Sequence, residues 1–276
     1  MRGITVAAIQ LKKDDNKEEN FKRVSRLVND AVNRGNVDLV CLPEKWNIRE
    51  GNPLTDSESP DGPSIRFLES VAEEYGVYVL GGSVWEKWEE KKIYNVSRLF
   101  DRFGKCVGVH RKIHLYGMEK QFFEPGNSLE PCETEFGKVG LTVCFDLAFP
   151  EVARILVLRG ADIIFNPAFI PSDGVENWHV YVKARALENR VPVVGVNPVS
   201  FERGLSWPGE SIIVSFHEGY ESPAKLNVLV GKKGEEDVLI QHVNLEYPRR
   251  LRVVRLSERA RIDNLLGLPR GNIFLV

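Results

Sequence analysis

The sequence lacks any long uninterrupted apolar segment. No apolar run approaches the roughly 20 residues that a membrane-spanning helix needs, and the chain enters a short strand pattern at once, without the pattern of a signal peptide. We therefore expect neither insertion into a membrane nor secretion.

Cysteine is also scarce. Cys41, Cys106, Cys132 and Cys144 are scattered along 276 residues, without the spacing of a disulfide framework or of a zinc site. Free thiols are typical of a reducing compartment, so the composition predicts a cytoplasmic protein. The sequence also lacks HExxH, a phosphate-binding glycine loop and a dinucleotide fingerprint, and we expect no metal or organic cofactor.

The chain carries little net charge. Its 37 Lys and Arg residues nearly balance 39 Asp and Glu residues, which leaves a formal charge of −2. Proteins that bind nucleic acid or anionic membranes usually have a basic excess, so we expect neither as the main partner. Hydrophobic residues form 43% of the sequence and charged residues 28%, as is typical of globular proteins with a substantial core.

Apolar periodicity predicts both strands and helices along the chain. Amphipathic spacing predicts helices over 16–34, 63–75, 150–159 and 176–190. Apolar runs predict strands over 4–10, 37–42, 77–84, 93–100, 105–110, 138–144, 161–166, 192–199, 210–214, 225–230 and 237–243. Residues 45–62 and 111–130 are predicted to be loops.

The order of these elements indicates the fold class. Helices alternate with strands in each half of the chain, whereas the middle has consecutive strands. This favours an α/β fold of four layers, an α-β-β-α sandwich of two mostly β sheets with outer helices, over one doubly wound sheet. Without repeats or linkers, residues 1–276 are predicted to form one domain, with an Arg-rich C-terminal arm over about 247–276.

Residues 138–151, KVGLTVCFDLAFPE, have the pattern of a buried strand, a sharp turn and a helix. Pro150 takes the first helical position, which suits proline because no intrahelical bond is lost there. Such an elbow can present a side chain at the end of a sheet, beside helix N–H groups. Cys144 lies at this turn and is a candidate nucleophile, although a single free cysteine is more often buried and inert.

Three more ionisable residues follow predicted strands or lie in the long loop after one. Glu44 follows the strand over 37–42, Lys112 follows the strand over 105–110, and Glu119 lies within the loop 111–130. Functional sites of α/β folds commonly lie at strand ends, and long ordered loops are usually functional. Each residue alone would be an ordinary surface charge.

The set of segments resembles the nitrilase superfamily, the carbon–nitrogen hydrolases. The resemblance rests on LPE with Glu44, RKIHL with Lys112, EKQFFEPG with Glu119 and VCFDLAFPE with Cys144, and continues through ADIIFNPA and RALENR. Each motif is weak alone, but their order covers nearly the whole chain. The resemblance implies hydrolysis of a non-peptide C–N bond of a small molecule, and a homodimer or a higher even-numbered homo-oligomer.

The resemblance also implies a role for each of the four residues. Cys144 would attack the substrate and form a thioester. Glu44 would accept the thiol proton, return it to the leaving nitrogen and then activate water. Lys112 would stabilise the oxyanion together with the Phe145 backbone N–H. Glu119 would orient Lys112 and position substrate or water.

Residues around these four would select the substrate. Leu147 and Ala148 stand where relatives that act on N-carbamoyl-D-amino acids carry arginines, so a small uncharged amide is expected. Nitrile hydrolysis, N-carbamoyl amine hydrolysis and a non-catalytic binding or scaffold protein on the same fold stay open. Candidate pocket residues are Trp46, Tyr116, Phe145, Asn166, Phe169, Ile170 and Trp178.

Other polar residues near these motifs suggest different roles. Asp146 is expected to brace the elbow by hydrogen bonds, and Glu124 in EPG to be a turn residue rather than a rival of Glu119. His110, His114 and His179 could each serve as the base of a Cys–His hydrolase, but no surrounding motif supports that role.

Overall fold

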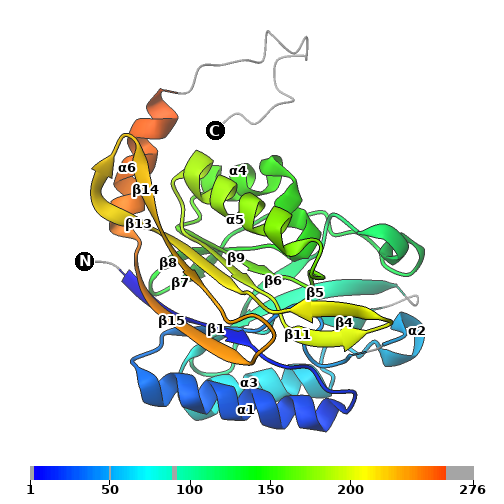
Figure 1. Cartoon of the computed structure of the whole chain (residues 1–276). Helices are drawn as coiled ribbons and strands as arrows, with labels where there is room; N and C mark the ends of the chain where they lie inside the picture. The colour runs from blue at the N-terminus through cyan, green and yellow to red at the C-terminus, as the bar shows by residue number, and fades with distance from the viewer. Residues whose placement is uncertain (1–2, 50, 89–91, 259–276) are drawn as a thin grey trace.

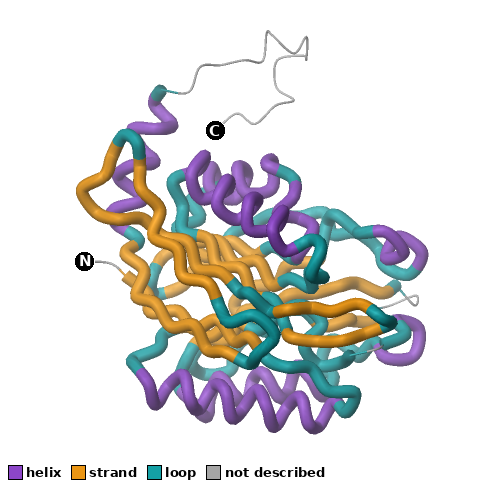
Figure 2. Tube along the Cα trace, viewed as in Figure 1, coloured by secondary structure: helices purple, strands orange, loops and turns teal. Residues whose placement is uncertain are grey.

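Two β-sheets packed face to face, with helices on both outer sides, make up the computed structural model (Figures 1 and 2). The structure describes residues 3–49, 51–88 and 92–258. The layers follow the order α-β-β-α, so the predicted fold class is confirmed. The part of the predicted C-terminal arm beyond residue 258 lies outside the described residues.

The first sheet combines the N-terminal half of the chain with its last strand. It contains β1 (Gly3–Gln10), β2 (Leu39–Cys41), β3 (Tyr78–Leu80), β4 (Val84–Lys87), β5 (Ile93–Phe100), β6 (Cys106–Arg111) and β15 (Asp237–Asn244). The strand order is β15-β1-β2-β3-β5-β4, with β6 also paired to β5. β2 runs parallel to β1 and β3, so the sheet is parallel only at its centre.

The second sheet contains β7 (Cys132–Thr134), β8 (Gly137–Leu141), β9 (Ile163–Pro167), β10 (Val193–Val196), β13 (Ile212–Glu221) and β14 (Ala224–Val230). Its order is β14-β13-β10-β9-β8-β7, and β8, β9 and β10 are parallel to one another. The parallel strands of each sheet therefore lie in its interior, where both faces are covered.

Helices cover the outer face of each sheet (Figure 1). α1 (Lys17–Arg34) and α3 (Pro63–Tyr75) pack on the first sheet. α4 (Pro150–Leu158), α5 (Val175–Asn189) and α6 (Glu246–Ser257) pack on the second. In the described part of the chain, none of the helices is long and apolar enough to cross a bilayer.

The position of β1 between two cores explains why its sequence is almost continuously apolar. Ala7 and Ile9 face the helices α1 and α3, whereas Ile4, Val6 and Ala8 face the second sheet. Successive side chains of a strand point to opposite faces, and both faces of β1 are buried. The apolar runs predicted as buried strands therefore mark the two central layers.

The structure corrects several predicted boundaries. The single strand predicted over 77–84 is divided into β3 and β4, because Gly82 has φ of +56° and lies too close to Pro43 O to carry a Cβ. The strand predicted over 138–144 ends at Leu141. The predicted loops contain a short helix, α2 (Pro53–Asp56), and a 3-10 helix, η2 (Gly117–Gln121).

A hairpin, β11 (Val199–Glu202) and β12 (Leu205–Pro208), was not predicted as such. Its turn residues Arg203 and Gly204 both have positive φ, +48° and +79°. Arginine is uncommon in that conformation, so the local sequence gave little sign of a two-residue turn. The hairpin matters because Glu202 pairs with Lys45, which follows Glu44 in the chain, and Trp207 stacks on Phe169, a candidate pocket residue.

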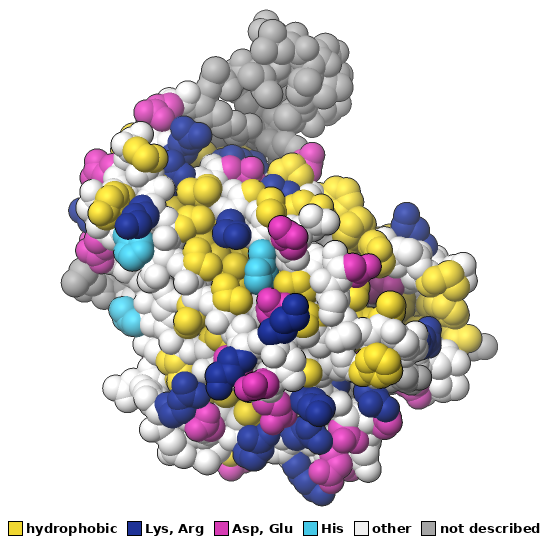
Figure 3. All heavy atoms as spheres, in the orientation of Figure 1, with side chains coloured by type: hydrophobic (Ala, Val, Ile, Leu, Met, Phe, Trp, Pro, Cys, Tyr) yellow, Lys and Arg dark blue, Asp and Glu magenta, His cyan; other side chains and the backbone are white. Residues whose placement is uncertain are grey.

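The molecular surface carries mixed charges. On the face drawn in Figure 3, Lys and Arg side chains alternate with Asp and Glu side chains. This view agrees with the near-zero net charge of the sequence.

Candidate active site

Lys112 lies between two carboxylates beyond the ends of β2 and β6. Its Nζ donates hydrogen bonds of 2.9 Å to Glu44 Oε1 and of 2.9 Å to Glu119 Oε1. The side chains of Lys112 and Glu44 are 1% and 5% exposed. A buried ammonium is tolerated only when it is paired and hydrogen-bonded, so these contacts fix the position of Lys112. Hydrogen bonds thus join three of the four predicted catalytic residues, and the fourth, Cys144, interacts with them through its charge.

Backbone hydrogen bonds fix Glu44 and Lys112 at the ends of their strands. The N–H of Glu44 donates to Ala168 O at 3.3 Å, just beyond β9 of the second sheet. The N–H of Lys112 donates to Asn95 O at 2.8 Å and extends the pairing of β5 with β6. Both side chains therefore stand on rigid strand ends.

Asn95 on β5 is a site residue that sequence reasoning missed. Its Nδ2 donates to Glu44 Oε1 at 2.8 Å and approaches Glu119 Oε1 at 3.5 Å. The available signal was a polar residue on the same face of the strand 93–100 as Ile93 and Leu99, a face that alternation assigns to the interior. A buried amide needs hydrogen-bond partners, and the two carboxylates provide them for Nδ2.

Glu119 is oriented by the turn that carries it. Its Oε2 accepts a 2.7 Å hydrogen bond from the N–H of Tyr116 at the start of η2. Glu124 is exposed, and no hydrogen bond joins its side chain to the site among the described residues. The geometry therefore favours Glu119 over Glu124 as the partner of Lys112.

The charges of this cluster influence one another strongly. Although burial opposes its charged form, the charges of Glu44 and Glu119 raise the pKa of Lys112 well above its ordinary value, and the Cys144 sulfur adds to the rise when it is ionised. Burial raises the pKa of Glu119; the charge of Lys112 acts in the opposite direction, and the like charge of Glu44 adds to the rise. Lys112 is therefore a permanent cation beside two carboxylates.

Cys144 begins a 3-10 turn, η3 (Cys144–Ala148), with φ of +48°. A non-glycine residue in the left-handed region is strained, and such strain is concentrated at functional elbows. Burial and the charge of Glu44 raise the pKa of the Cys144 thiol, whereas Lys112 and the backbone N–H of Phe169 lower it. The resting sulfur is therefore a thiol that needs a base before it can attack.

Asp146 braces this elbow, as the sequence predicted. Its fully buried carboxylate accepts hydrogen bonds from the N–H groups of Val143, Ile113 and His114 at 3.0, 3.1 and 2.8 Å. It also contacts His110 Nε2 at 2.9 Å and His114 Nδ1 at 3.1 Å. The brace ties the Cys144 turn to the residues that follow Lys112, and both histidines serve it.

Three of the candidate pocket residues lie inside the protein. Trp46 belongs to the core between the first sheet and its helices, where its indole N–H donates to Gly81 O, so the expected place in a pocket wall is wrong. Trp178 donates to Asn166 Oδ1 at 2.9 Å, and Asn166 Nδ2 donates to Thr142 Oγ1 and Cys144 O. Asn166 and Trp178 are buried, and this burial favours a role in supporting the Cys144 turn over direct contact with a substrate.

The other candidate pocket residues lie nearer the surface. Phe145 and Phe169 are half-buried, and Tyr116 is 65% exposed. The rings of Tyr116 and Phe145 meet edge to face with centroids 5.1 Å apart, and Phe169 stacks on Trp207 of β12. Half-buried Ile170 follows Phe169.

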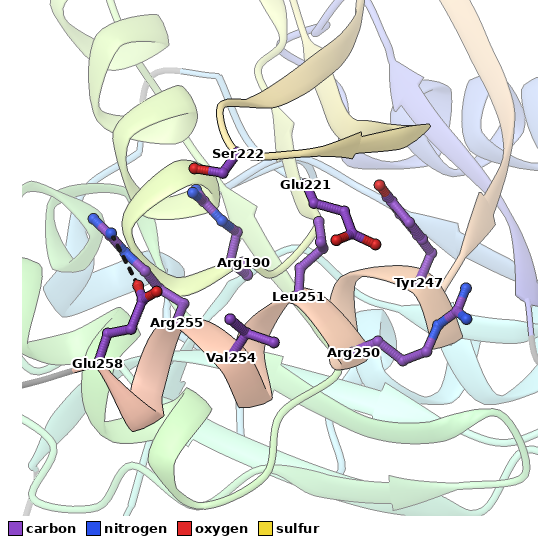
Figure 4. Close-up of a pocket in the computed structure, with 9 residues that line it drawn as sticks. All are labelled: Arg190, Glu221, Ser222, Tyr247, Arg250, Leu251, Val254, Arg255 and Glu258. Atoms are coloured by element: carbon purple, nitrogen blue, oxygen red, sulfur yellow. Dashed lines mark ion pairs between the residues drawn. The ribbon is translucent and has the colours of Figure 1, made fainter.

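A surface cavity of about 210 Å3 lies elsewhere, between the end of α5, α6 and the turn that joins β13 to β14 (Figure 4). It is lined by Arg190, Glu221, Ser222, Tyr247, Arg250, Leu251, Val254, Arg255 and Glu258. None of the candidate catalytic residues contributes to it, so we treat this cavity as separate from the site.

The chain belongs to the carbon–nitrogen hydrolase family, within the nitrilase superfamily. The model of this family matches residues 5–252. The omega-amidase NIT2-B of Xenopus laevis is 30% identical over 264 residues, which cover 90% of this chain and 91% of that protein. A nitrilase of Pyrococcus abyssi is 34% identical over 249 residues, 87% of this chain and 89% of that protein.

Solved structures show the same fold. A carbon–nitrogen hydrolase from Helicobacter pylori superposes with a TM-score of 0.83 over 98% of this chain and 99% of its own, at 24% identity. Together with the family match, the relatives identify this chain as an enzyme of the amidase or nitrilase type.

Asp146→Asn should destabilise the fold by about 3–5 kcal/mol, because it removes a buried charge that several donors share. Hydrogen bonds to His110 and His114 outweigh burial and lower the pKa of Asp146 far below its ordinary value. Its contribution is therefore complete above pH of about 4 and is lost as the pH falls further.

Urea unfolding at several pH values measures this contribution. The gap in unfolding free energy between wild type and Asp146→Asn should be constant near neutral pH and should narrow below pH of about 4. Asp30→Asn, on the exposed side of α1, is the matched control and should change little. A variant as stable as the wild type at pH 7 would refute the brace.

Proposed function

We propose that this enzyme hydrolyses a small uncharged amide to an acid and ammonia through a thioester on Cys144. The observation that carries the proposal is the Lys112 ammonium held between Glu44 and Glu119 while its charge couples to the Cys144 sulfur. This arrangement supplies a nucleophile, a base and a cation for the oxyanion within one buried cluster.

In the first half of the reaction, Glu44 accepts the Sγ proton as the sulfur attacks the amide carbon. The carbonyl oxygen becomes an oxyanion, which the Lys112 ammonium and the Phe145 backbone N–H stabilise; each such donor is typically worth about a hundredfold or more in rate. The C–N bond then breaks, and Glu44 returns its proton to the leaving nitrogen, so ammonia departs and a thioester remains.

In the second half, Glu44 accepts a proton from water, whose oxygen attacks the thioester carbon. The C–S bond breaks, the acid leaves and the proton returns to the sulfur, so every group regains its starting state. Lys112 keeps its charge throughout, because its carboxylate partners raise its pKa. Glu119 and Asn95 hold Lys112 and Glu44 in place.

We further propose that Phe145, Phe169 and Tyr116 contact the substrate, while Asn166 and Trp178 support the elbow from within the core.

Residues 1–276 would form one domain in the cytoplasm, where the four free cysteines stay reduced. The four catalytic groups supply the whole reaction, so the proposed enzyme uses no metal or organic cofactor.

Nitrile and N-carbamoyl amine hydrolysis are the alternatives within the same chemistry, and relatives named omega-amidase and nitrilase both match this chain. A screen of amides, nitriles and carbamoyl compounds for ammonia release would separate them. A complete absence of turnover would favour a non-catalytic binding protein on this fold.

Cys144→Ala should abolish ammonia release while the protein stays folded, because the thioester needs the sulfur whose charge couples to Lys112. Cys106→Ala is the matched control, since Cys106 is also half-buried but lies on β6. The measurement is ammonia release together with thermal melting of both variants. Near-normal turnover by Cys144→Ala would overturn the mechanism.

A neutral short-chain or aromatic amide should be preferred over a matched acid-bearing amide by a hundredfold or more in kcat/KM, because an unpaired buried carboxylate is costly. Leu147 and Ala148 offer no cation after the elbow. Arg185 donates to their backbone oxygens at 3.0 and 2.7 Å, so its guanidinium is already engaged. Equal values for the two amides would show that a basic group from elsewhere meets the substrate.

We also propose a homodimer or a higher even-numbered oligomer formed through the helices on the second sheet. Val180, Tyr181 and Leu187 on α5 are 55%, 38% and 37% exposed, and exposed apolar clusters mark interaction surfaces. Light scattering at micromolar concentration should give at least twice the chain mass. Val180→Glu should shift the enzyme toward the monomer, whereas a wild-type monomer would contradict the pairing.

A further inference from the structure

The surface cavity beside α6 has a charged lining of its own (Figure 4). Arg190 ends α5, Arg250 and Arg255 lie on α6, and Glu221 and Glu258 also line the cavity. Three guanidinium groups against two carboxylates leave an excess of one positive charge. The cavity therefore favours an occupant with one negative charge.

Two of these arginines have hydrogen-bond donors to spare. Arg255 lies 3.9 Å from Glu258 at the closest N–O approach, which is too far for a hydrogen bond. Arg190 donates to Leu187 O, which uses only part of the five N–H donors of its guanidinium. Both arginines stand at the same end of the cavity as Ser222 in Figure 4. This end can therefore bind an anionic group.

The charges of the two arginines also oppose each other. Burial and the positive charge of Arg255 lower the pKa of Arg190, while the charge of Glu258 acts in the opposite direction. Arginine keeps its proton at ordinary pH, so the repulsion between the two guanidinium groups persists. A carboxylate between them would relieve this repulsion and could accept two parallel hydrogen bonds from one guanidinium.

The middle of the cavity is apolar. Leu251 and Val254 lie between its two ends in Figure 4 and form what we call the apolar floor. The volume of about 210 Å3 is smaller than the roughly 300–1,000 Å3 of sites for drug-sized ligands. The cavity therefore suits a small molecule with a short carbon chain.

Tyr247 supplies an unmet polar group at the other end. It is 5% exposed, and its hydroxyl has no hydrogen-bond partner among the described residues. Buried polar groups are normally hydrogen-bonded, so this wall of the cavity calls for an oxygen from an occupant. Tyr247 and Arg255 lie in the first and last turns of α6, about 12 Å apart along the helix axis.

We propose that this cavity binds a small monocarboxylate, with its carboxylate between Arg190 and Arg255 and an uncharged oxygen at the far end of its chain on Tyr247. The chain lies on the apolar floor. Glu221 stands near Tyr247 in Figure 4, and its charge disfavours a second carboxylate at that end. Binding at this site does not require the proposed hydrolysis.

Calorimetric titration of the full-length protein at neutral pH and low salt tests this site, with 6-hydroxyhexanoate as the probe. The probe should bind more tightly than hexanoate, which lacks the hydroxyl, 1,6-hexanediol, which lacks the carboxylate, and adipate, which carries a second charge. Arg255→Met should weaken binding by about tenfold or more, since it removes a charge-assisted hydrogen bond. Tyr247→Phe should bind hexanoate as the wild type does and lose the preference for the hydroxy acid.

Two further variants are controls. Arg34→Met, on the exposed side of α1, removes the same charge elsewhere and should bind the probe unchanged. Cys144→Ala should also bind it unchanged, which separates this cavity from the candidate active site. Thermal melting checks that each variant is folded, and Arg255 is exposed, so its replacement should not affect the fold.

A wild-type protein that does not bind the probe would overturn the inference. So would undiminished binding by Arg255→Met, a preference for the hydroxy acid that survives Tyr247→Phe, or loss of binding in Cys144→Ala.

Discussion

The rest of the site depends on the ion pairs that the buried Lys112 ammonium forms with Glu44 and Glu119. A lysine that is 1% exposed requires carboxylate partners; Glu44 meets this need from 68 positions away in the chain, and Glu119 from the loop that follows Lys112. The two carboxylates would repel each other without the cation between them. The cation that holds the carboxylates is also the group proposed to stabilise the oxyanion, so structural and chemical requirements coincide in one side chain.

The site exists only because two sheets pack face to face. Glu44, Asn95 and Lys112 stand on or beyond strands of the first sheet, whereas Cys144 follows β8 of the second. The strained φ of Cys144 costs of order 1–3 kcal/mol, and the buried Asp146 network offsets that cost by bonding both sides of the junction. Inter-sheet packing therefore places the proposed nucleophile Cys144 and the proposed base Glu44.

Much of the fold could be predicted from local pattern. The helix over 63–75 and the strand over 93–100 have the bounds that the sequence predicted, because proline, glycine and apolar periodicity act over a few residues. Prediction failed where a long-range contact decided the conformation. Gly82 divides a predicted strand because its backbone meets Pro43, and the aromatic pattern gave no sign that Trp46 would be enclosed beneath α1 and α3.

The sequence by itself determined the fold class and the identity of the four candidate catalytic residues, since the ordered motifs are properties of the chain. Only the tertiary structure decided which other side chains join them. Asn95 reaches Glu44 across 51 positions, and Lys13 and Lys45 reach Glu202 across 189 and 157 positions. No local pattern encodes such pairs, because they form only when buried charges and amides must find partners as the sheets close.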